Sequence, residues 1–197
     1  MLNLDIINEN GLSYVEYLEL TKTSVENKNP RGGENMLGYT ELNERRMARI
    51  EKTLEINDKI IEALNNLNEE YVWMLISEPW CGDAAQNLPV IAKIAESSNG
   101  KIDLKIILRD DHPEIMDLYL TNGGKSVPKM ACFKKSDFSE QFVWGPRPAV
   151  CQQIVIDWKA AGGENKEQML KDVQTWYAKD KSQSLQIELA EKIKALN

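Results

Sequence analysis

Apolar residues at helical spacing dominate the first third of the chain. Between residues 41 and 67 they recur at intervals of three, four or seven positions, as Met47, Ile50, Leu54, Ile61 and Leu64. This is the period of one face of a helix, and Thr40 is a typical N-cap residue. We therefore expect one long amphipathic helix over 41–67. A short amphipathic stretch at 12–20 and a Pro- and Gly-containing loop at 27–33 precede it.

The pattern changes abruptly at residue 71. Residues 71–76 form a short, continuous apolar run rich in β-formers, which is typical of a strand buried on both faces of a sheet. Further strands are predicted at 102–108, 129–133 and 141–144, and helices at 84–97, 113–120 and after Pro148. A parallel βαβ start closed by a β-hairpin predicts an α/β sandwich of about 90 residues.

Helical periodicity returns after the glycine pair at 162–163. Asn165 followed by Gln168 resembles a capping box, and residues 166–196 predict one or two helices. We therefore divide the chain into an N-terminal helical extension (1–69), an α/β domain (70–162) and a C-terminal helical extension (163–197) that packs on the core.

Composition and charge narrow the class of protein. The chain has 197 residues, of which 42% are hydrophobic and 28% charged, as in ordinary soluble proteins. The apolar run at 72–76, or 71–76 with Tyr71, is far shorter than the ~20 residues of a membrane-spanning helix, and the N-terminus does not resemble a secretory signal. The formal charge of -7 disfavours nucleic-acid binding. We expect a cytoplasmic protein with neither a membrane nor a nucleic-acid partner.

The acidity is concentrated at one end of the chain. Residues 1–70 contain 14 acidic and 8 basic side chains. We interpret this excess as a solvated helical face, and the alternative is a docking surface for a basic partner.

The chain has three cysteines and a single histidine, His112. Cys81, Cys132 and Cys151 are 51 and 19 residues apart, so they form neither a C-x-x-C motif nor a disulfide framework. These residues also do not supply the two local pairs of ligands that a structural zinc site needs. We expect no metal and no cofactor.

Cys81 stands between a predicted strand and a helix that begins near Gly82. The backbone N–H groups and the dipole of a helix N-terminus favour an anion there, and they lower a thiol pKa into the range ~3.5–7.5. Asp83 is a like charge close to Cys81 and opposes the thiolate. The sequence leaves open which effect dominates, and the alternative for Cys81 is a small buried hydrophobe.

The surrounding residues resemble those of the thioredoxin-like family over roughly residues 70–160. The resemblance rests on four features in the family's order: an apolar strand before Trp80, Cys81 and Gly82; Pro89, eight residues after the cysteine; Val127 and Pro128 before the next strand; and Gly145 after the hairpin. More narrowly, the segments SEPWCGDA (77–84), LRDD (108–111) and VWGPR (143–147) resemble an uncharacterised bacterial branch with a C-G-D-A or C-G-D-C motif.

The resemblance implies a thioredoxin-like three-layer α/β sandwich with N-terminal and C-terminal helical extensions. It also implies a helix kinked at Pro89 and a cis Val127–Pro128 peptide against Cys81, with the Val127 backbone free to pair with an extended partner segment. The implied substrate groove comprises Trp80, Gly82, Asp83, Val127, Pro128 and Gly145. Trp144 and Arg147 are further candidates for this groove.

Two positions depart from a dithiol member of the family. Ala84 occupies the position of the resolving cysteine, and Leu75 occupies a position where dithiol members tend to place a buried carboxylate. Intramolecular dithiol exchange at this motif is therefore excluded. Cys132 is expected in the core. The alternative is that Cys151 serves as the resolving thiol, which requires its Cα to lie within about 7 Å of the Cys81 Cα.

Two polar residues near the motif have alternative roles. Asp83 replaces the proline usual between the two cysteines, and we expect it to stabilise the helix N-terminus. The alternative is that it accepts a proton or a hydrogen bond from a substrate. His112 is expected in a loop, and a role as catalytic base is its alternative.

Two functions compete. In the first, Cys81 attacks a disulfide or a glutathione adduct of a protein or peptide, and an external thiol such as glutathione resolves the mixed disulfide. In the second, the fold is a non-catalytic module that binds a peptide or protein. An iron–sulfur carrier resembling monothiol glutaredoxins is a third, although that branch typically presents C-G-F-S.

Overall fold

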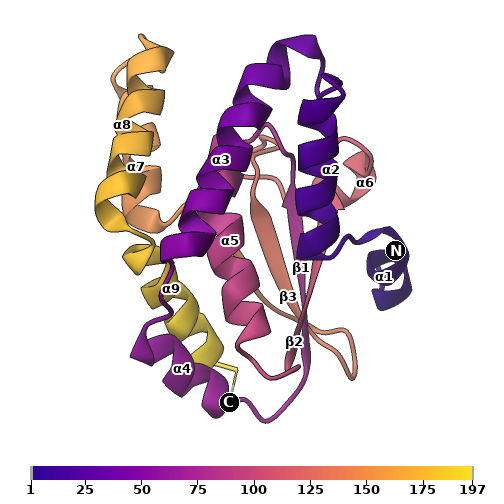
Figure 1. Ribbon diagram of the computed structural model, residues 1–197. Helices are drawn as coiled ribbons and strands as arrows, with labels where there is room; N and C mark the ends of the chain where they lie inside the picture. The colour runs from indigo at the N-terminus through magenta and orange to yellow at the C-terminus, as the bar shows by residue number, and fades with distance from the viewer. Residues whose placement is uncertain (1, 197) are drawn as a thin grey trace.

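The computed structural model describes residues 2–196 and places a four-stranded sheet at their centre (Figure 1). The strands are β1 (Tyr71–Ser77), β2 (Ile102–Leu108), β3 (Lys129–Lys134) and β4 (Glu140–Trp144), in the order β2-β1-β3-β4. β1 is parallel to β2 and antiparallel to β3, which is antiparallel to β4. The predicted βαβ start and closing hairpin are confirmed. Residues 1 and 197, at the ends of the two predicted extensions, lie outside the described residues.

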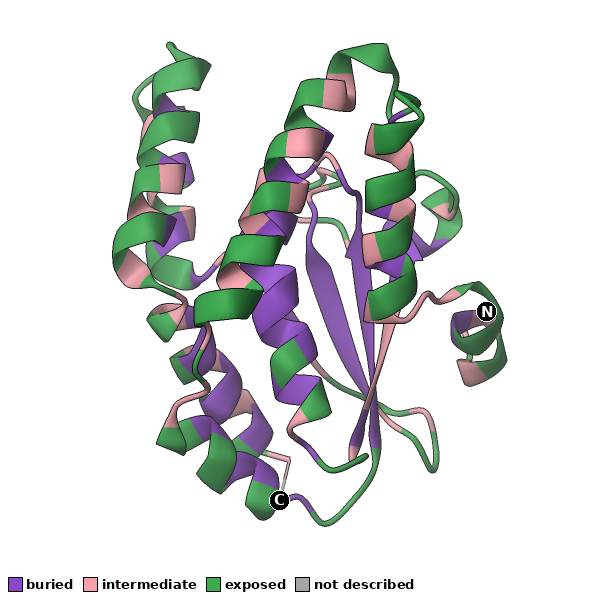
Figure 2. Ribbon diagram, viewed as in Figure 1, coloured by how far each residue is buried: buried purple, intermediate pink, exposed green. Residues whose placement is uncertain are grey.

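Helices cover both faces of the sheet, as the predicted three-layer sandwich requires. Every residue of β1 is buried, and its side chains alternate between two apolar clusters. One cluster unites the sheet with α2 (Tyr14–Glu26), α3 (Leu37–Thr53), α4 (Asp58–Asn65), α5 (Gly82–Glu96) and α9 (Gln183–Lys194). The other unites it with α1 (Leu4–Asn10) and α6 (Pro113–Met116). Figure 2 shows buried strands between helices whose outer faces are exposed.

The C-terminal helices have two different partners. α7 (Ala149–Ala160) and α8 (Lys166–Asp180) pack on each other around a separate cluster that includes Cys151, Val173 and Tyr177. α9 packs on α4 and joins the main core. Within residues 2–196, no helix is both long and apolar enough to cross a membrane.

The predicted single helix over 41–67 is wrong, because α3 ends at Thr53 and α4 begins at Asp58. Leu54 has an extended backbone, with ψ 125°. Asn57 caps α4 by accepting a hydrogen bond from the Ile60 N–H at 3.0 Å, and its own N–H donates to Gln186 Oε1 of α9 at 2.8 Å. The interruption lets α4 turn onto α9. Thr40 is not an N-cap either, since it lies inside α3 and donates to the Met36 carbonyl.

Smaller differences concern helix ends. α1 was not predicted. α2 begins with a capping box between Ser13 and Glu16 and continues beyond the predicted stretch at 12–20. A short 3₁₀ helix (Glu34–Met36) precedes α3, and α6 is shorter than the predicted 113–120 helix. Asn165 caps α8 by accepting from the Gln168 N–H, as predicted, but the Gln168 side chain donates to Asp172 instead of closing a capping box.

Candidate functional site

Cys81 is the N-cap residue of α5, directly after the turn that leaves β1. The turn is closed by a hydrogen bond from the Cys81 N–H to the Glu78 carbonyl. Cys81 Sγ accepts a hydrogen bond from the Ala84 N–H at 3.5 Å and donates one to the Val127 carbonyl at 3.2 Å. The sulfur therefore lies between the first turn of α5 and the loop that precedes β3.

That loop carries the cis Val127–Pro128 peptide, and Gly145 packs against it. Gly145 has φ +111°, and a Cβ on it would lie 2.5 Å from the Pro128 carbonyl oxygen. Both the backbone conformation and the close approach require glycine at this position. Cys81, Val127, Pro128 and Gly145 are thus brought together.

The N-terminal part of the chain covers Trp80. A Cβ on Gly32 would lie 2.8 Å from Trp80 Nε1, and the Arg109 guanidinium lies 4.6 Å from the centre of the indole ring. The indole is therefore held between the loop before α3 and a side chain that follows β2.

Side chains from α3 and α8 meet over the first turn of α5. A Cβ on Gly82 would lie 3.3 Å from Gln174 Nε2 of α8 and 3.4 Å from Arg46 Nη1 of α3. Gln174 also accepts a hydrogen bond from Gln86 at 2.8 Å. Cys81 itself is only 8% exposed, and it is buried in the apolar cluster that contains Val127, Ala131 and Met116.

Asp83 forms a buried ion pair with Arg147, at 2.5 Å. Their side chains are 10% and 15% exposed. Burial raises the pKa of Asp83, and the charge and hydrogen bond of Arg147 oppose that rise without cancelling it. A hydrogen bond with Tyr177 also lowers the pKa of Asp83, while Oδ1 is buried and has no partner within ordinary hydrogen-bond geometry among residues 2–196. Two candidate groove residues are thus joined in one pair beside the cysteine.

Burial raises the pKa of the Cys81 thiol to about 12, and the charge of Asp83 contributes to the rise. The N–H groups of Ala84 and Asp83 and the Arg147 cation act in the opposite direction and are outweighed. The competition that the sequence left open is thereby decided: at neutral pH Cys81 is a protonated thiol, and the lowering expected at a helix N-terminus is overcome.

The other two cysteines are buried. Cys132 lies in β3, within the main core, and Cys151 lies in α7, in the cluster that α7 shares with α8. Burial raises the pKa of each thiol to about 12. Within residues 2–196, none of the three cysteines forms a disulfide.

Two further candidates have partners of their own. His112 precedes α6, and its Nδ1 lies 3.3 Å from the Glu114 carboxylate. Trp144 is buried at the end of β4 and donates to Glu188 of α9 at 2.8 Å.

Several structural contacts around the site were not predicted. Glu78, three residues before Cys81, is fully buried and accepts hydrogen bonds from Arg31 and the Asp110 N–H. Tyr177 of α8 accepts a hydrogen bond from Asn87 of α5 at 2.8 Å. These contacts join segments that are 32 to 90 residues apart, so no local sequence pattern predicts them.

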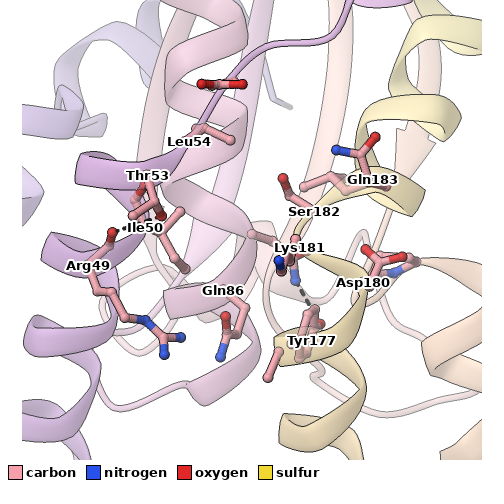
Figure 3. A pocket seen from close by; sticks show the side chains of 15 residues that line it. Arg49, Ile50, Thr53, Leu54, Gln86, Tyr177, Asp180, Lys181, Ser182 and Gln183 are labelled. Atoms are coloured by element: carbon pink, nitrogen blue, oxygen red, sulfur yellow. Dashed lines mark hydrogen bonds between the residues drawn. The ribbon is translucent and has the colours of Figure 1, made fainter.

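A cavity of about 490 Å³ opens beside α5, between α3 and the junction of α8 with α9 (Figure 3). Arg49 and Thr53 line one side, Lys181 and Ser182 the other, and Gln86 lies between them. Among residues 2–196, no group of three or more His, Cys, Asp or Glu side chains is placed to hold a metal ion.

Comparison with known proteins gives matches at the levels of family, sequence and structure. A family model described as thioredoxin matches residues 31–159. Thioredoxin M5, chloroplastic, of Oryza sativa subsp. japonica is 33% identical over 79 residues, which cover 40% of this chain and 44% of that protein. Thioredoxin 1 of Nostoc sp. is 34% identical over 56 residues, 28% of this chain and 50% of that protein. The chain spans about half the length of the curated relatives it matches.

Two solved structures share the fold over most of their length. A protein of unknown function from Pseudomonas aeruginosa superposes with a TM-score of 0.56 at 16% identity, covering 96% of this chain and 99% of that one. An HIV epitope scaffold superposes with a TM-score of 0.55 at 15% identity, covering 88% and 96%.

Proposed function

The chain belongs to the thioredoxin family, and from that premise we propose that it exchanges thiols and disulfides by a monothiol route, with Cys81 as the attacking group. The observation that carries this proposal is the placement of Cys81: its sulfur caps α5 against the Val127 carbonyl, while Ala84 stands at the resolving position. In this proposal residues 70–162 form the exchange domain, and 1–69 and 163–197 are extensions of it.

The proposed reaction has two displacement steps. Cys81 attacks one sulfur of a disulfide or glutathione adduct on a protein or peptide, the S–S bond breaks, and the other sulfur leaves with the electron pair and takes a proton. An external thiol such as glutathione then attacks the mixed disulfide and releases Cys81. The cytoplasm supplies such thiols and is the proposed location.

In the proposed groove, Trp80, Gly82 and Asp83 lie on the side of α5, and Val127, Pro128 and Gly145 on the opposite side. The backbone of Val127 would align an extended partner segment beside the sulfur. Because Cys81 is only 8% exposed, a partner must displace part of the protein that covers the sulfur.

The same burial favours a second candidate function. A thiol that is buried and protonated at neutral pH is typical of a structural cysteine. In this alternative the groove binds a peptide or protein and Cys81 does not turn over.

Trapping of the mixed disulfide separates the two functions. Reduced protein is mixed with a peptide that carries a glutathione adduct, quenched with acid and analysed by mass spectrometry. We expect one adduct, on Cys81, which glutathione removes, and the same result in Cys132→Ser and Cys151→Ser. Cys81→Ser should form none. Peptide binding without an adduct in the wild type would favour the binding module, and a Cys81–Cys151 disulfide would contradict the monothiol route.

A further inference from the structure

The attack proposed for Cys81 requires the proton on its sulfur to leave. In the resting structure the S–H group donates to the Val127 carbonyl at 3.2 Å, and this carbonyl is not a base that retains a proton. The sulfur is buried, so bulk water has little access to it. A proton acceptor must therefore lie inside the site or arrive with the substrate.

Asp83 provides such an acceptor in the same turn of helix as the sulfur. It is two residues from Cys81, its side chain is 10% exposed, and one of its oxygens, Oδ1, is buried without a hydrogen-bond partner among the described residues. A buried carboxylate oxygen normally has a partner, so an unused one requires an explanation. Its other oxygen, Oδ2, is held by Arg147.

The other acidic and basic groups near the motif are already engaged. Glu78 accepts hydrogen bonds through both of its oxygens, from Arg31 and the Asp110 N–H. His112 pairs with Glu114, and Leu75 contributes no charge. Asp83 is thus the acid near Cys81 that combines burial with an unused oxygen.

We propose that Asp83 is the acid–base group of the Cys81 reaction, an inference that rests on the proposed function. Asp83 Oδ1 accepts the proton of the Cys81 thiol as the sulfur attacks the substrate disulfide. The S–S bond breaks, its electron pair moves to the leaving sulfur, and protonated Asp83 returns the proton to that sulfur. The step involves no net gain or loss of protons, and its oxidant is the substrate disulfide.

The charges around the pair are consistent with this transfer. The negative charge of Asp83 is one reason why the Cys81 pKa is raised, and a proton on Asp83 removes that cause. The Arg147 cation and the Ala84 N–H remain to stabilise the thiolate. The titratable and charged groups that act on Asp83 come from α3, α5, α7, α8 and the loop after β4: Arg46, Cys81, Cys151, Tyr177 and Arg147.

Asp83→Asn in the full chain, on a Cys132→Ser/Cys151→Ser background, tests the inference. The rate of mixed-disulfide formation is measured with an aromatic disulfide, whose leaving thiol is acidic and needs no proton, and with an alkyl disulfide, whose leaving thiol needs one. We expect the alkyl reaction to fall by on the order of 10²-fold relative to the aromatic one. Alkylation by iodoacetamide, whose leaving iodide needs no proton, should change to the same extent as the aromatic reaction.

Glu78→Gln is the matched control, because it converts another buried acid near Cys81 to its amide. It should leave the ratio of the alkyl to the aromatic rate unchanged. If Asp83→Asn does not fold, as judged by circular dichroism, the wild type is tested instead: its alkyl reaction, which includes return of the proton, should show a larger solvent deuterium isotope effect than its aromatic reaction.

The outcomes separate the inference from the function on which it rests. An equal change of both rates in Asp83→Asn, or equal isotope effects in the wild type, would overturn the role of Asp83 and leave the monothiol function standing. A wild type that reacts with neither disulfide would overturn both.

Discussion

Arg31 and Glu78 are joined by two hydrogen bonds, from Nε at 2.9 Å and from Nη2 at 3.2 Å. The pair connects the loop before α3 to the turn that carries Cys81. The Glu78 side chain is fully buried and that of Arg31 is 22% exposed. Arg31 also reaches Asp111, after β2, at 2.8 Å. The Arg31 side chain thus attaches the N-terminal region to the two loops that follow the carboxyl ends of β1 and β2.

Arg31→Ala should lower the free energy of unfolding by about 3 kcal/mol, because it leaves a buried carboxylate without its cation. Urea denaturation followed by circular dichroism measures the change. Arg45→Ala is the control: Arg45 is 75% exposed and pairs with Glu41 across the surface of α3, so its loss should cost less than about 1 kcal/mol. Equal effects of the two substitutions would contradict a stabilising role for the buried pair.

The buried thiols should make stability fall in mild alkali. Each cysteine has a pKa of about 12 in the folded protein against an ordinary value of 9.0. Above pH 9 the unfolded chain loses thiol protons that the folded chain keeps, so rising pH favours unfolding, by up to about 1.4 kcal/mol per pH unit for each thiol. Below pH 8 these groups have no such effect.

Urea denaturation of the wild type and of Cys132→Ser at pH 8, 9, 9.5 and 10 checks this sign and magnitude. The substitution changes the stability at every pH, so the informative quantity is the slope of the free energy of unfolding against pH between pH 9 and 10. It should be shallower in the variant by roughly one thiol's contribution. Parallel slopes would show that Cys132 ionises equally well in the folded protein.

Gly145→Ala should destabilise the fold by on the order of 3 kcal/mol, because it combines an unfavourable φ with a backbone clash. The added Cβ would lie 2.5 Å from the Pro128 carbonyl oxygen. Gly123→Ala separates the two contributions: Gly123 has φ +76° and open space around it, so only the φ cost of about 1 kcal/mol applies. Thermal unfolding of both variants makes the comparison. A Gly145→Ala protein no less stable than Gly123→Ala would mean that the Pro128 loop moves freely.

Gln186→Leu should cost about 2–3 kcal/mol, because Gln186 is fully buried and its side chain holds the break between α3 and α4. Its Oε1 accepts from the Asn57 N–H, and its Nε2 donates to the Glu55 carbonyl at 3.1 Å. Gln183→Leu, at an exposed position of the same helix, should change stability by less than about 0.5 kcal/mol. The two variants are compared by urea denaturation, and similar stabilities would contradict the assigned role.

The sheet was readable from the sequence because each of its signals is local. The continuous apolar run of β1 and the glycine and proline punctuation around β3 and β4 fix strand and turn without reference to distant residues. The break after Thr53 was not readable, since apolar spacing continues through it. The Asn57 N–H finds its acceptor in Gln186, 129 residues away, and that contact is absent from any local window.

The candidate site could also be predicted from the sequence only in part. The order of Trp80, Cys81 and Pro128 along the chain pointed to the position of the sulfur. The direction of its pKa shift could not be predicted, because it depends on burial among residues from distant segments, such as Met116, Val127 and Ala131. Local electrostatics at the helix N-terminus favoured a thiolate, and tertiary packing reversed the outcome.

The contact between α4 and α9 limits how early the N-terminal helices can complete their packing during synthesis. The buried face of α4, formed by Ile60, Ala63 and Leu64, is completed by a helix that begins at Gln183. A ribosome must therefore synthesise more than 100 further residues before this face is fully covered. During that interval the apolar face of α4 stays partly uncovered, and α9 completes the core once it has been synthesised.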